Sequence, residues 1–264
     1  MSIIDQIKSH VSIRKYKPDP VPQEIITEIL EAGIRASSSG NMNTCSIIVT
    51  TDPEIRQQLH EPHMKQSMVL DAPVFLTFCA DFNRMRKWLK QSDAPDGFDN
   101  FMSFMVAAFD AVLISQNVAL AAESHGLGIC YLGSTFANAD QISKVLNIPK
   151  GVMPVVGFSL GWPDEAPALR DRLPLDGIVH QETYQDYSEA DITRIFKDRE
   201  KAGWERYMSV PRLKKLVEEN DVENLAQIYT VVKYSRESHQ EFSNKVLAFL
   251  KDQDFMNHEL WQFI

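Results

Sequence analysis

The chain has 264 residues, of which 44% are hydrophobic and 24% are charged, and its formal net charge is −9. This composition is typical of a globular protein that can bury a sizeable core without cross-links. The acidic balance excludes broad binding to nucleic acids or anionic membranes, but it is compatible with a local basic pocket for one small anion. The three cysteines, Cys45, Cys79 and Cys130, are widely spaced and form no CxxC pair, which favours buried thiols in a reducing compartment. No signal peptide is recognisable, so we expect a cytoplasmic protein.

The first half of the chain alternates predicted helices and strands. Helices are predicted over residues 3–9 and 24–37, the second preceded by Pro22, and a short one over 53–60. The β-branched and aromatic runs at 46–51 and 73–81 predict two buried strands. Residues 84–100 are polar and turn-rich, which predicts a surface lid whose part 88–100 lines the site.

The second half of the chain begins with a long apolar helix, predicted over residues 101–125 and ended by Gly126. A strand at 128–134, a helix from Asn138 to Asn147 and a strand at 152–162 follow. From residue 188 the pattern is charged and helical, over 188–206, about 210–220 and about 236–251. The order of elements indicates one α+β domain, with residues 1–187 as its body and 188–264 as a C-terminal helical extension.

The long helix raises the possibility of a membrane span. Asp110, Gln116 and Asn117 interrupt its apolar run, and no basic flank anchors it. A span would rarely carry three such residues unpaired. We therefore expect a helix that is buried in a core or in a dimer interface.

Three short motifs place polar groups where an anion or a flat ring could bind. The segment HVSIRKY, residues 10–16, combines His10, Ser12 and Arg14 and predicts a phosphate cradle, the alternative being an exposed linker. In ALRDRLP, Arg170 and Arg172 lie two residues apart on an extended segment and face the same way, the alternative being a solvated turn. The loop SSSGNMNTC, residues 37–45, is either a further polar contact or a simple turn.

The glycines of GLGICYLGST, residues 126–135, resemble a dinucleotide loop only superficially. Such a loop leaves a strand and opens a helix, whereas these glycines leave a helix and open a strand. Gly133 and Ser134 end that strand, where a glycine lets a flat ring approach and a backbone N–H can donate to a ring nitrogen.

Other catalytic signatures are absent or weak. His60 and His63 have a spacing that suits a metal, but the sequence offers no obvious third ligand and Pro62 interrupts the helix. The sequence contains no GxSxG, HExxH or Walker motif. We therefore predict no metal site and no hydrolase or nucleoside-triphosphatase activity.

Taken together and in this order, HVSIRKY, the serine-rich loop, AAESHGLGICYLGS, VVGFSLGWP and LRDRLP resemble the nitroreductase family. The likeness is to its branch of NADPH-dependent, FMN-containing flavin and nitro-compound reductases, and it covers residues 3–190. It implies a central mixed β-sheet surrounded by helices. It also implies an FMN-binding homodimer with sites at the subunit interface and a C-terminal extension that packs on the same domain and on the partner.

The resemblance also implies roles for single residues. His10 and Ser12 match positions near the FMN phosphate and ribityl chain, and Arg14 matches a cation near the pyrimidine side of the flavin, where it would stabilise the charge of the reduced ring. The remaining cofactor contacts implied are Ser39, Gln66 at the ring edge, Tyr131, Leu132, Gly133 and Ser134 under the isoalloxazine, and Arg170 and Arg172 at the phosphate. No side chain is required as a general acid, so no catalytic residue is assigned.

The function implied is that of a ping-pong oxidoreductase. NADH or NADPH reduces FMN at N5 and leaves, and a nitroaromatic, quinone or free flavin then takes the electrons. The nicotinamide preference stays open, because residues 214–238 lack the Thr-Trp-Ser motif of the NADPH-using members. The alternative is a non-enzymatic or specialised flavin-binding protein that reacts weakly with nicotinamides.

Overall fold

The computed structural model describes residues 2–257 and divides the chain into two compact units. The first consists of Met1–Ala168 together with Phe242–Ile264, and the second of Leu169–Glu241. Most of the predicted site residues lie in the first unit, whereas Arg170 and Arg172 lie in the second. Each unit is described by itself below.

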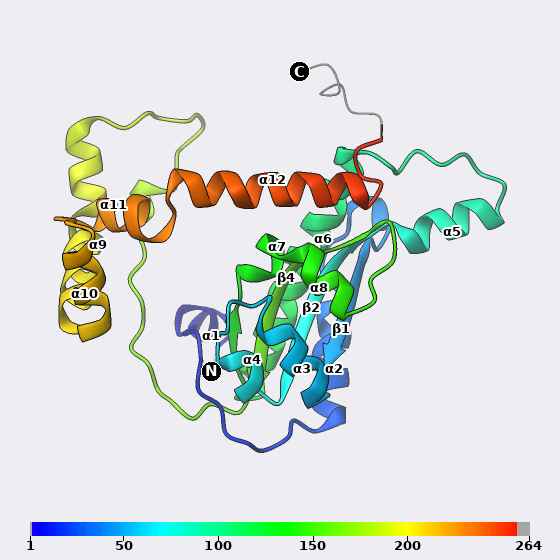
Figure 1. The fold of residues 1–264 in the computed structure, drawn as a ribbon, viewed down its shortest axis with the longest axis horizontal. Helices are drawn as coiled ribbons and strands as arrows, with labels where there is room; N and C mark the ends of the chain where they lie inside the picture. Colours follow the sequence, from blue (N-terminus) through cyan, green and yellow to red (C-terminus); the bar gives the residue numbers. More distant parts are fainter. Residues whose placement is uncertain (1, 258–264) are drawn as a thin grey trace. The chain divides into compact units, whose positions relative to one another are not determined.

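A four-stranded sheet forms the centre of the first unit (Figure 1). Its strands lie in the order β1 (Cys45–Thr50), β2 (Val74–Asp81), β4 (Val152–Gly161) and β3 (Gly128–Tyr131). The four predicted strands and the fold class, a sheet surrounded by helices, are confirmed. All three strand pairings are antiparallel, so the mixed strand directions that the resemblance implied are not found in the described sheet. A hydrophobic run predicts a strand but carries no information about the direction of its neighbour.

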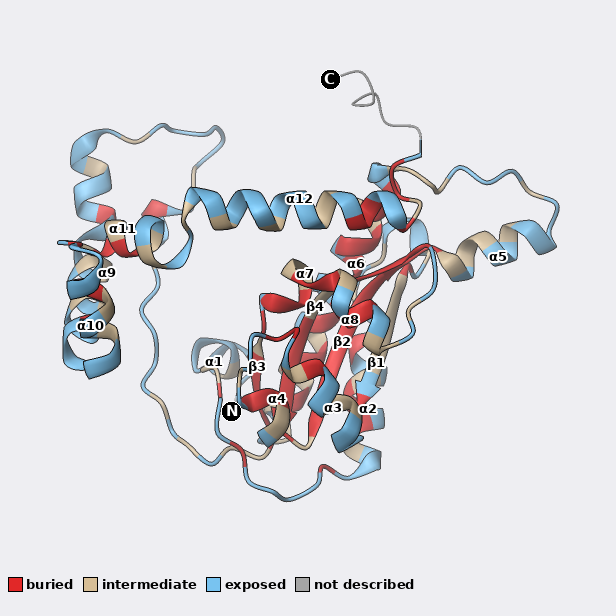
Figure 2. Cartoon of the chain, in the orientation of Figure 1, coloured by how far each residue is buried: buried red, intermediate tan, exposed pale blue. Residues whose placement is uncertain are grey.

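Helices cover both faces of this sheet, and all eight residues of β2 are buried between them (Figure 2). On one face, α2 (Gln23–Gly33) and α6 (Phe101–Ser124) pack on Leu76 and Phe78 of β2. On the other face, Phe75 of β2 packs against apolar side chains of α3 (Pro53–His60), α4 (Met68–Asp71) and α8 (Ala139–Val145). The alternation of side chains along β2 therefore separates two apolar layers.

The helix α6 begins and ends as predicted. The Asn100 side chain caps it by accepting from the backbone N–H of Ser103 at 3.1 Å, and Gly126 follows with a φ of 77° that ends it. The helix is long and apolar enough to cross a membrane, but half of its most apolar window is buried inside the unit. Asp110, which interrupts the apolar run, is itself buried and hydrogen-bonded. One side of α6 is buried in the core, as predicted, and its other side exposes apolar residues.

The predicted lid at 84–100 is wrong in its first half. Residues Asn83–Gln91 form a helix, α5, with no fully buried residue, and 92–100 follow without regular structure. Met85 and Leu89 are half-buried one turn apart, which is enough to orient a short amphipathic helix. The dense charges of RMRKWLK concealed this spacing in the sequence.

The remaining short elements of the first unit differ from the predictions mainly at their ends. The first helix, α1, covers Ile3–Lys8, and a 3-10 turn, η1, covers Ser39–Asn41. The predicted strand 128–134 ends at Tyr131, and α7 (Ser134–Ala137) follows Gly133 at once. Asn138 occupies the N-cap of α8, but its side-chain amide donates to the carbonyl of Pro62 at 2.7 Å instead of capping the helix.

From Glu189 onward the second unit is helical, as predicted for the chain after residue 188. It contains η2 (Leu175–Gly177), α9 (Glu189–Ser209), α10 (Pro211–Glu219), α11 (Leu225–Gln227) and the π-helix η3 (Ile228–Lys233). The last helix, α12 (Arg236–Asp252), continues into the first unit from residue 242. A small core of Tyr207, Val217, Val222, Leu225 and Ile228 holds the second unit together.

Candidate functional site

The segment HVSIRKY is bound to the edge of the sheet rather than being a free linker. The backbone N–H of Ile13 donates to the carbonyl of Ile129 in β3 at 2.9 Å, and Ile13 itself is buried. The buried hydroxyl of Tyr16 donates to the carbonyl of Ile13 at 2.6 Å and is hydrogen-bonded to Ser159 of β4. These apolar and backbone contacts leave His10, Ser12 and Arg14 partly or fully exposed along one side.

Carboxylates order two of the polar groups of this segment. The Nδ1 of His10 lies 2.5 Å from Oε1 of Glu123, near the end of α6, and the imidazole is 29% exposed. The backbone N–H groups of Arg14 and Lys15 both donate to Glu165, at 2.5 and 3.1 Å. The guanidinium of Arg14 remains exposed, with one long contact of 3.4 Å to the carbonyl of Ser12. A cation and an oriented imidazole therefore lie beside the end of β3.

The turn after β3 presents open space and unused donors. Gly133 is exposed, and a Cβ built on it would meet no heavy atom within 4 Å. Within residues 2–257, the backbone N–H groups of Gly133 and Ser134 donate to no described acceptor. Leu132 is fixed just before them by a bond from its N–H to the carbonyl of Gly157, 2.9 Å long. This combination fits a flat aromatic ring with hydrogen-bond acceptors on its edge, such as a flavin.

Tyr131 supports this turn from the side of α6. Its hydroxyl donates to the hydroxyl of Ser115 at 3.0 Å, and its ring meets that of Phe158 edge-on at 5.1 Å. Burial raises the pKa of Tyr131 to about 12, so the phenol stays protonated and acts as a hydrogen-bond donor.

Gln66 is adjacent to the same turn. Its Nε2 donates to the hydroxyl of Ser134 at 3.3 Å and to the carbonyl of His63 at 3.1 Å. The Nδ1 of His63 lies 2.9 Å from the same hydroxyl, so the hydroxyl of Ser134 is hydrogen-bonded to both His63 and Gln66. Sequence reasoning considered His63 only as a metal ligand and missed this contact, because no spacing in the sequence relates residue 63 to residue 134. Within the described residues, no group of three His, Cys, Asp or Glu side chains could hold a metal ion.

Ser39 lies in a loop that a buried carboxylate holds. Asp110 of α6 accepts from the N–H of Ser39 at 3.1 Å, from the hydroxyl of Ser38 at 2.7 Å, and from the N–H and hydroxyl of Thr44 at 3.2 and 2.9 Å. Asp110 and Glu123 are more than three turns apart on α6, or about 20 Å along its axis. Ser39 is therefore attached to the middle of the helix, and His10 is attached near its C-terminal end.

Arg170 and Arg172 are exposed residues of the second unit. The Nη1 of Arg172 donates to the carbonyls of Asp171 and Arg170, at 3.0 and 3.4 Å, and the carboxylate of Asp171 pairs with Arg199 at 3.1 Å. The two arginines thus belong to a locally ordered polar segment. Their convergence on a phosphate stays a prediction.

The cysteines show no sign of reactivity. Cys79 and Cys130 are buried and Cys45 is half-buried, as expected. Burial raises the pKa of Cys45 to about 12 and also raises the pKa of Cys79 and of Cys130.

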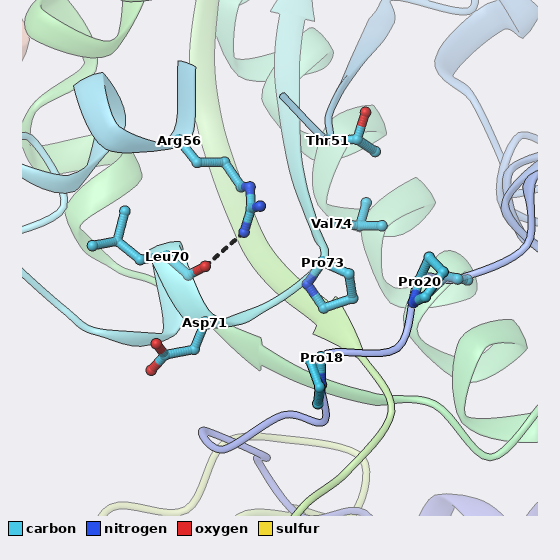
Figure 3. A pocket seen from close by; sticks show the side chains of 9 residues that line it. Pro18, Pro20, Thr51, Arg56, Leu70, Asp71, Pro73 and Val74 are labelled. Carbon is cyan, nitrogen blue, oxygen red and sulfur yellow. Dashed lines mark hydrogen bonds between the residues drawn. The ribbon is translucent and has the colours of Figure 1, made fainter. Parts of the chain in front are cut away.

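A shallow cavity of about 420 Å³ lies away from these residues (Figure 3). Prolines and aliphatic side chains form most of its wall, which consists of Pro18, Pro20, Val21, Thr51, Arg56, Leu70, Asp71, Pro73 and Val74. The guanidinium of Arg56 is used structurally, because its Nη1 donates to the carbonyls of Leu70, at 2.7 Å, and Ala72. None of the predicted cofactor residues lines this cavity.

Comparison with known proteins identifies the family of the chain. The model of the Nitroreductase family matches residues 7–162, a range that includes every predicted cofactor residue except Arg170 and Arg172. An NADPH-flavin oxidoreductase of Vibrio harveyi is 36% identical over 190 residues, which are 72% of this chain and 77% of that protein. An FMN reductase [NAD(P)H] of Bacillus subtilis is 35% identical over 192 residues, which are 71% of this chain and 76% of that protein.

The similarity extends to the whole structure. A crystal structure from Bacteroides fragilis, of a protein provisionally described as an oxidoreductase, superposes with a TM-score of 0.88 at 39% identity. The superposition covers 96% of this chain and all of that one. The family model matches more than half of the chain, and the alignments cover most of this chain and most of each relative. The chain therefore belongs to the nitroreductase family.

Proposed function

We propose that the protein is an FMN-dependent NAD(P)H oxidoreductase that reduces nitroaromatic, quinone or flavin acceptors in a ping-pong cycle. The observation that carries the proposal is the open turn at Gly133, with two unused N–H donors beside Gln66 and Ser134, in a chain of this family. The names of the relatives support it, since they include an NADPH-flavin oxidoreductase and an FMN reductase.

The chemistry that FMN supplies when bound is acceptance of a hydride at N5 and delivery of the electrons to an acceptor. The protein's part is to hold the ring and to tune its charge. The N–H groups of Gly133 and Ser134 donate to the ring edge, and Gln66 contributes a further polar contact there. Tyr131 and Leu132 form the surface under the ring, and the Arg14 cation favours the negative charge that the ring gains on reduction.

The phosphate of the cofactor requires cations and donors at the other end of the molecule. His10 supplies an imidazole that is oriented by Glu123, and Ser12 supplies a hydroxyl from the segment HVSIRKY. Arg170 and Arg172 supply two guanidinium groups, which suit phosphate because their donors bind its oxygens in pairs. Ser39 is the remaining assigned contact.

We further propose that the active form is a cytoplasmic homodimer, with residues 188–264 packing on both subunits. The helix α6 exposes an apolar face, formed by Met102, Phe109, Val112 and Leu113, whose spacing places them on one side. Such a face favours a second copy of the chain. Ser39 and His10 contact α6 at Asp110 and Glu123, which are about 20 Å apart along the helix. This distance supports a dimer, because the Ser39 that completes the site of one subunit would then come from its partner.

An anaerobic absorbance spectrum of the purified protein, before and after NADH and then NADPH, tests the proposal. We expect a flavin band that bleaches within seconds with one or both nucleotides, which also reveals the donor. A flavin band that neither nucleotide bleaches would instead favour a flavin-binding protein without reductase activity. No flavin band, even after reconstitution with FMN, would refute the cofactor assignment.

A further inference from the structure

His63 is a fully buried histidine with contacts to both polar side chains beside the Gly133 turn. Its Nδ1 lies 2.9 Å from the hydroxyl of Ser134, and its carbonyl accepts from Nε2 of Gln66 at 3.1 Å. Its ring packs against Phe75 of β2, with centroids 4.7 Å apart. The sheet and the turn therefore meet at the His63 imidazole, and Gln66 is joined to the backbone carbonyl of the same residue.

Backbone hydrogen bonds and a chain reversal hold His63 and Gln66 in these positions. The N–H of His63 donates to the carbonyl of Leu59 in α3 at 3.1 Å, and the amide of Asn138 holds the carbonyl of Pro62 at 2.7 Å. Met64 and Lys65 then adopt positive φ angles of 56° and 54°, which reverse the chain so that Gln66 returns to Ser134. Two consecutive non-glycine residues in the left-handed region are uncommon and persist only where surrounding contacts hold them.

The chemistry of the junction is that of a neutral imidazole. Burial lowers the pKa of His63 to about 4, and no charged neighbour contributes to the shift. A neutral ring has one nitrogen that donates and one that accepts, and a serine hydroxyl can rotate to match either. The contact to Ser134 is therefore available at any pH near neutrality.

The hydrogen bonds among His63, Ser134 and Gln66 occupy some polar groups of this region and leave others available to a ligand. The Ser134 hydroxyl and the Gln66 Nε2 are used inside the protein. No donor among residues 2–257 reaches the Oε1 of Gln66, and the N–H groups of Gly133 and Ser134 are likewise unused. One acceptor and two donors thus remain together beside open space.

We propose that His63 is a positioning residue of the flavin site, which fixes Ser134 and Gln66 so that these three remaining groups meet the edge of the isoalloxazine ring. This inference rests on the proposed function. His63 acts through its two neighbours and does not itself touch the cofactor.

The test compares variants of His63 that separate ring packing from hydrogen bonding. His63→Phe keeps an aromatic ring against Phe75 but removes both nitrogens, whereas His63→Asn keeps a nitrogen close to the position of Nδ1. Each variant is prepared free of FMN and titrated with FMN, following flavin fluorescence and the visible spectrum. His60→Phe is the matched control, because His60 is half-buried three residues earlier and its side chain makes no described hydrogen bond.

We expect His63→Phe to bind FMN roughly tenfold more weakly than the wild type and to shift the flavin band, because the loss of one buried hydrogen bond has about this effect on an equilibrium constant. His63→Asn restores affinity to within about twofold, since an amide can replace the lost contact, and His60→Phe matches the wild type. Ser134→Ala weakens FMN binding as well, and His63→Phe combined with Ser134→Ala is no worse than Ser134→Ala alone, because both remove the same contact.

Several results would overturn the inference. If His63→Phe bound FMN with unchanged affinity and spectrum, or if its effect added fully to that of Ser134→Ala, His63 would have no positioning role through Ser134. If His63→Phe did not fold, a failure of His63→Asn to bind FMN as well as the wild type would decide the matter in the same way. A wild-type protein that binds no FMN would refute the proposed function itself, which distinguishes the two failures.

Discussion

The carboxylate of Asp110 accepts a hydrogen bond from the backbone N–H of Ser39 at 3.1 Å, and so joins the serine-rich loop to the middle of α6. The same buried carboxylate accepts three further bonds from Ser38 and Thr44. The residue that breaks the apolar run of α6 in the sequence is thus the one that gives the loop its shape.

Replacing Asp110 with alanine is therefore expected to destabilise the first unit. Four donors lose their common acceptor, and the buried ones cannot all turn to water, so the free energy of unfolding should fall by about 3 kcal/mol. Urea denaturation followed by circular dichroism measures this. Asp19→Ala is the control, because Asp19 is exposed and makes no described side-chain bond. A loss equal to that of the control would contradict the role of Asp110.

Removing both guanidinium groups from the ALRDRLP segment, by Arg170→Ala together with Arg172→Ala, should release FMN. Each charge-assisted phosphate contact contributes roughly 1.5–3 kcal/mol, so the affinity should fall at least about a hundredfold. Isothermal titration with FMN gives the result. The paired change Lys214→Ala and Lys215→Ala removes the same charge from the same unit at exposed positions and should leave affinity unchanged. Stoichiometric FMN in the arginine double variant would refute the phosphate assignment.

Filling the open space at Gly133 should exclude the ring without harming the fold. Gly133 has a φ of −64°, which any residue adopts, and a Cβ there meets nothing within 4 Å. We expect Gly133→Val to weaken FMN binding roughly tenfold or more, because its methyl groups occupy the space of the ring. Thermal unfolding of the FMN-free protein should hardly change. Gly97→Val, at another position with open space around it, should alter neither property.

The stability of the protein should depend on pH through His63. Its pKa is about 4 in the folded protein and about 6.5 when unfolded, so the unfolded chain binds more protons between these values. Stability should therefore fall as the pH falls from 6.5 to 4, by about 3 kcal/mol at most from this residue. His63→Phe should remove this part of the pH dependence, as measured by urea denaturation at pH 4.5 and 7. An unchanged difference between the two pH values would show that His63 is not responsible.

A charge on the exposed face of α6 should separate the proposed dimer. Phe109 and Leu113 are 55% and 48% exposed in the single chain, and burying a glutamate there between two subunits is unfavourable. Sedimentation analysis should show the wild type as a dimer and Phe109→Glu with Leu113→Glu as a monomer. Met64→Glu, at an exposed apolar residue outside α6, should stay dimeric. If the wild type sedimented as a monomer, or if it bound to added lipid vesicles instead of forming a dimer, the face of α6 would not be a dimer interface.

Much of the fold was predictable because it depends on local patterns. The runs SIIVTT and PVFLTFCAD are strands because β-branched and aromatic side chains fill both faces of a buried sheet, and the structure places β1 and β2 there. The end of α6 was predictable because Gly126 has the positive φ that a helix terminus needs. The helix α5 was missed because most of its residues are charged or polar, which is typical of a loop, although its few apolar residues lie on one face of the helix.

The sequence by itself determined the family, the order of the elements and the clusters of residues that could bind a flavin, because these depend on motifs a few residues long. Only the tertiary structure decided that Gln66 and His63 meet Ser134, and that Asp110 holds Ser39. These contacts join positions about 70 residues apart, and they form because the sheet and α6 bring separate segments together. A local sequence pattern does not predict contacts between such distant residues. Bringing them together costs chain entropy, and only burial of the whole apolar core offsets this cost.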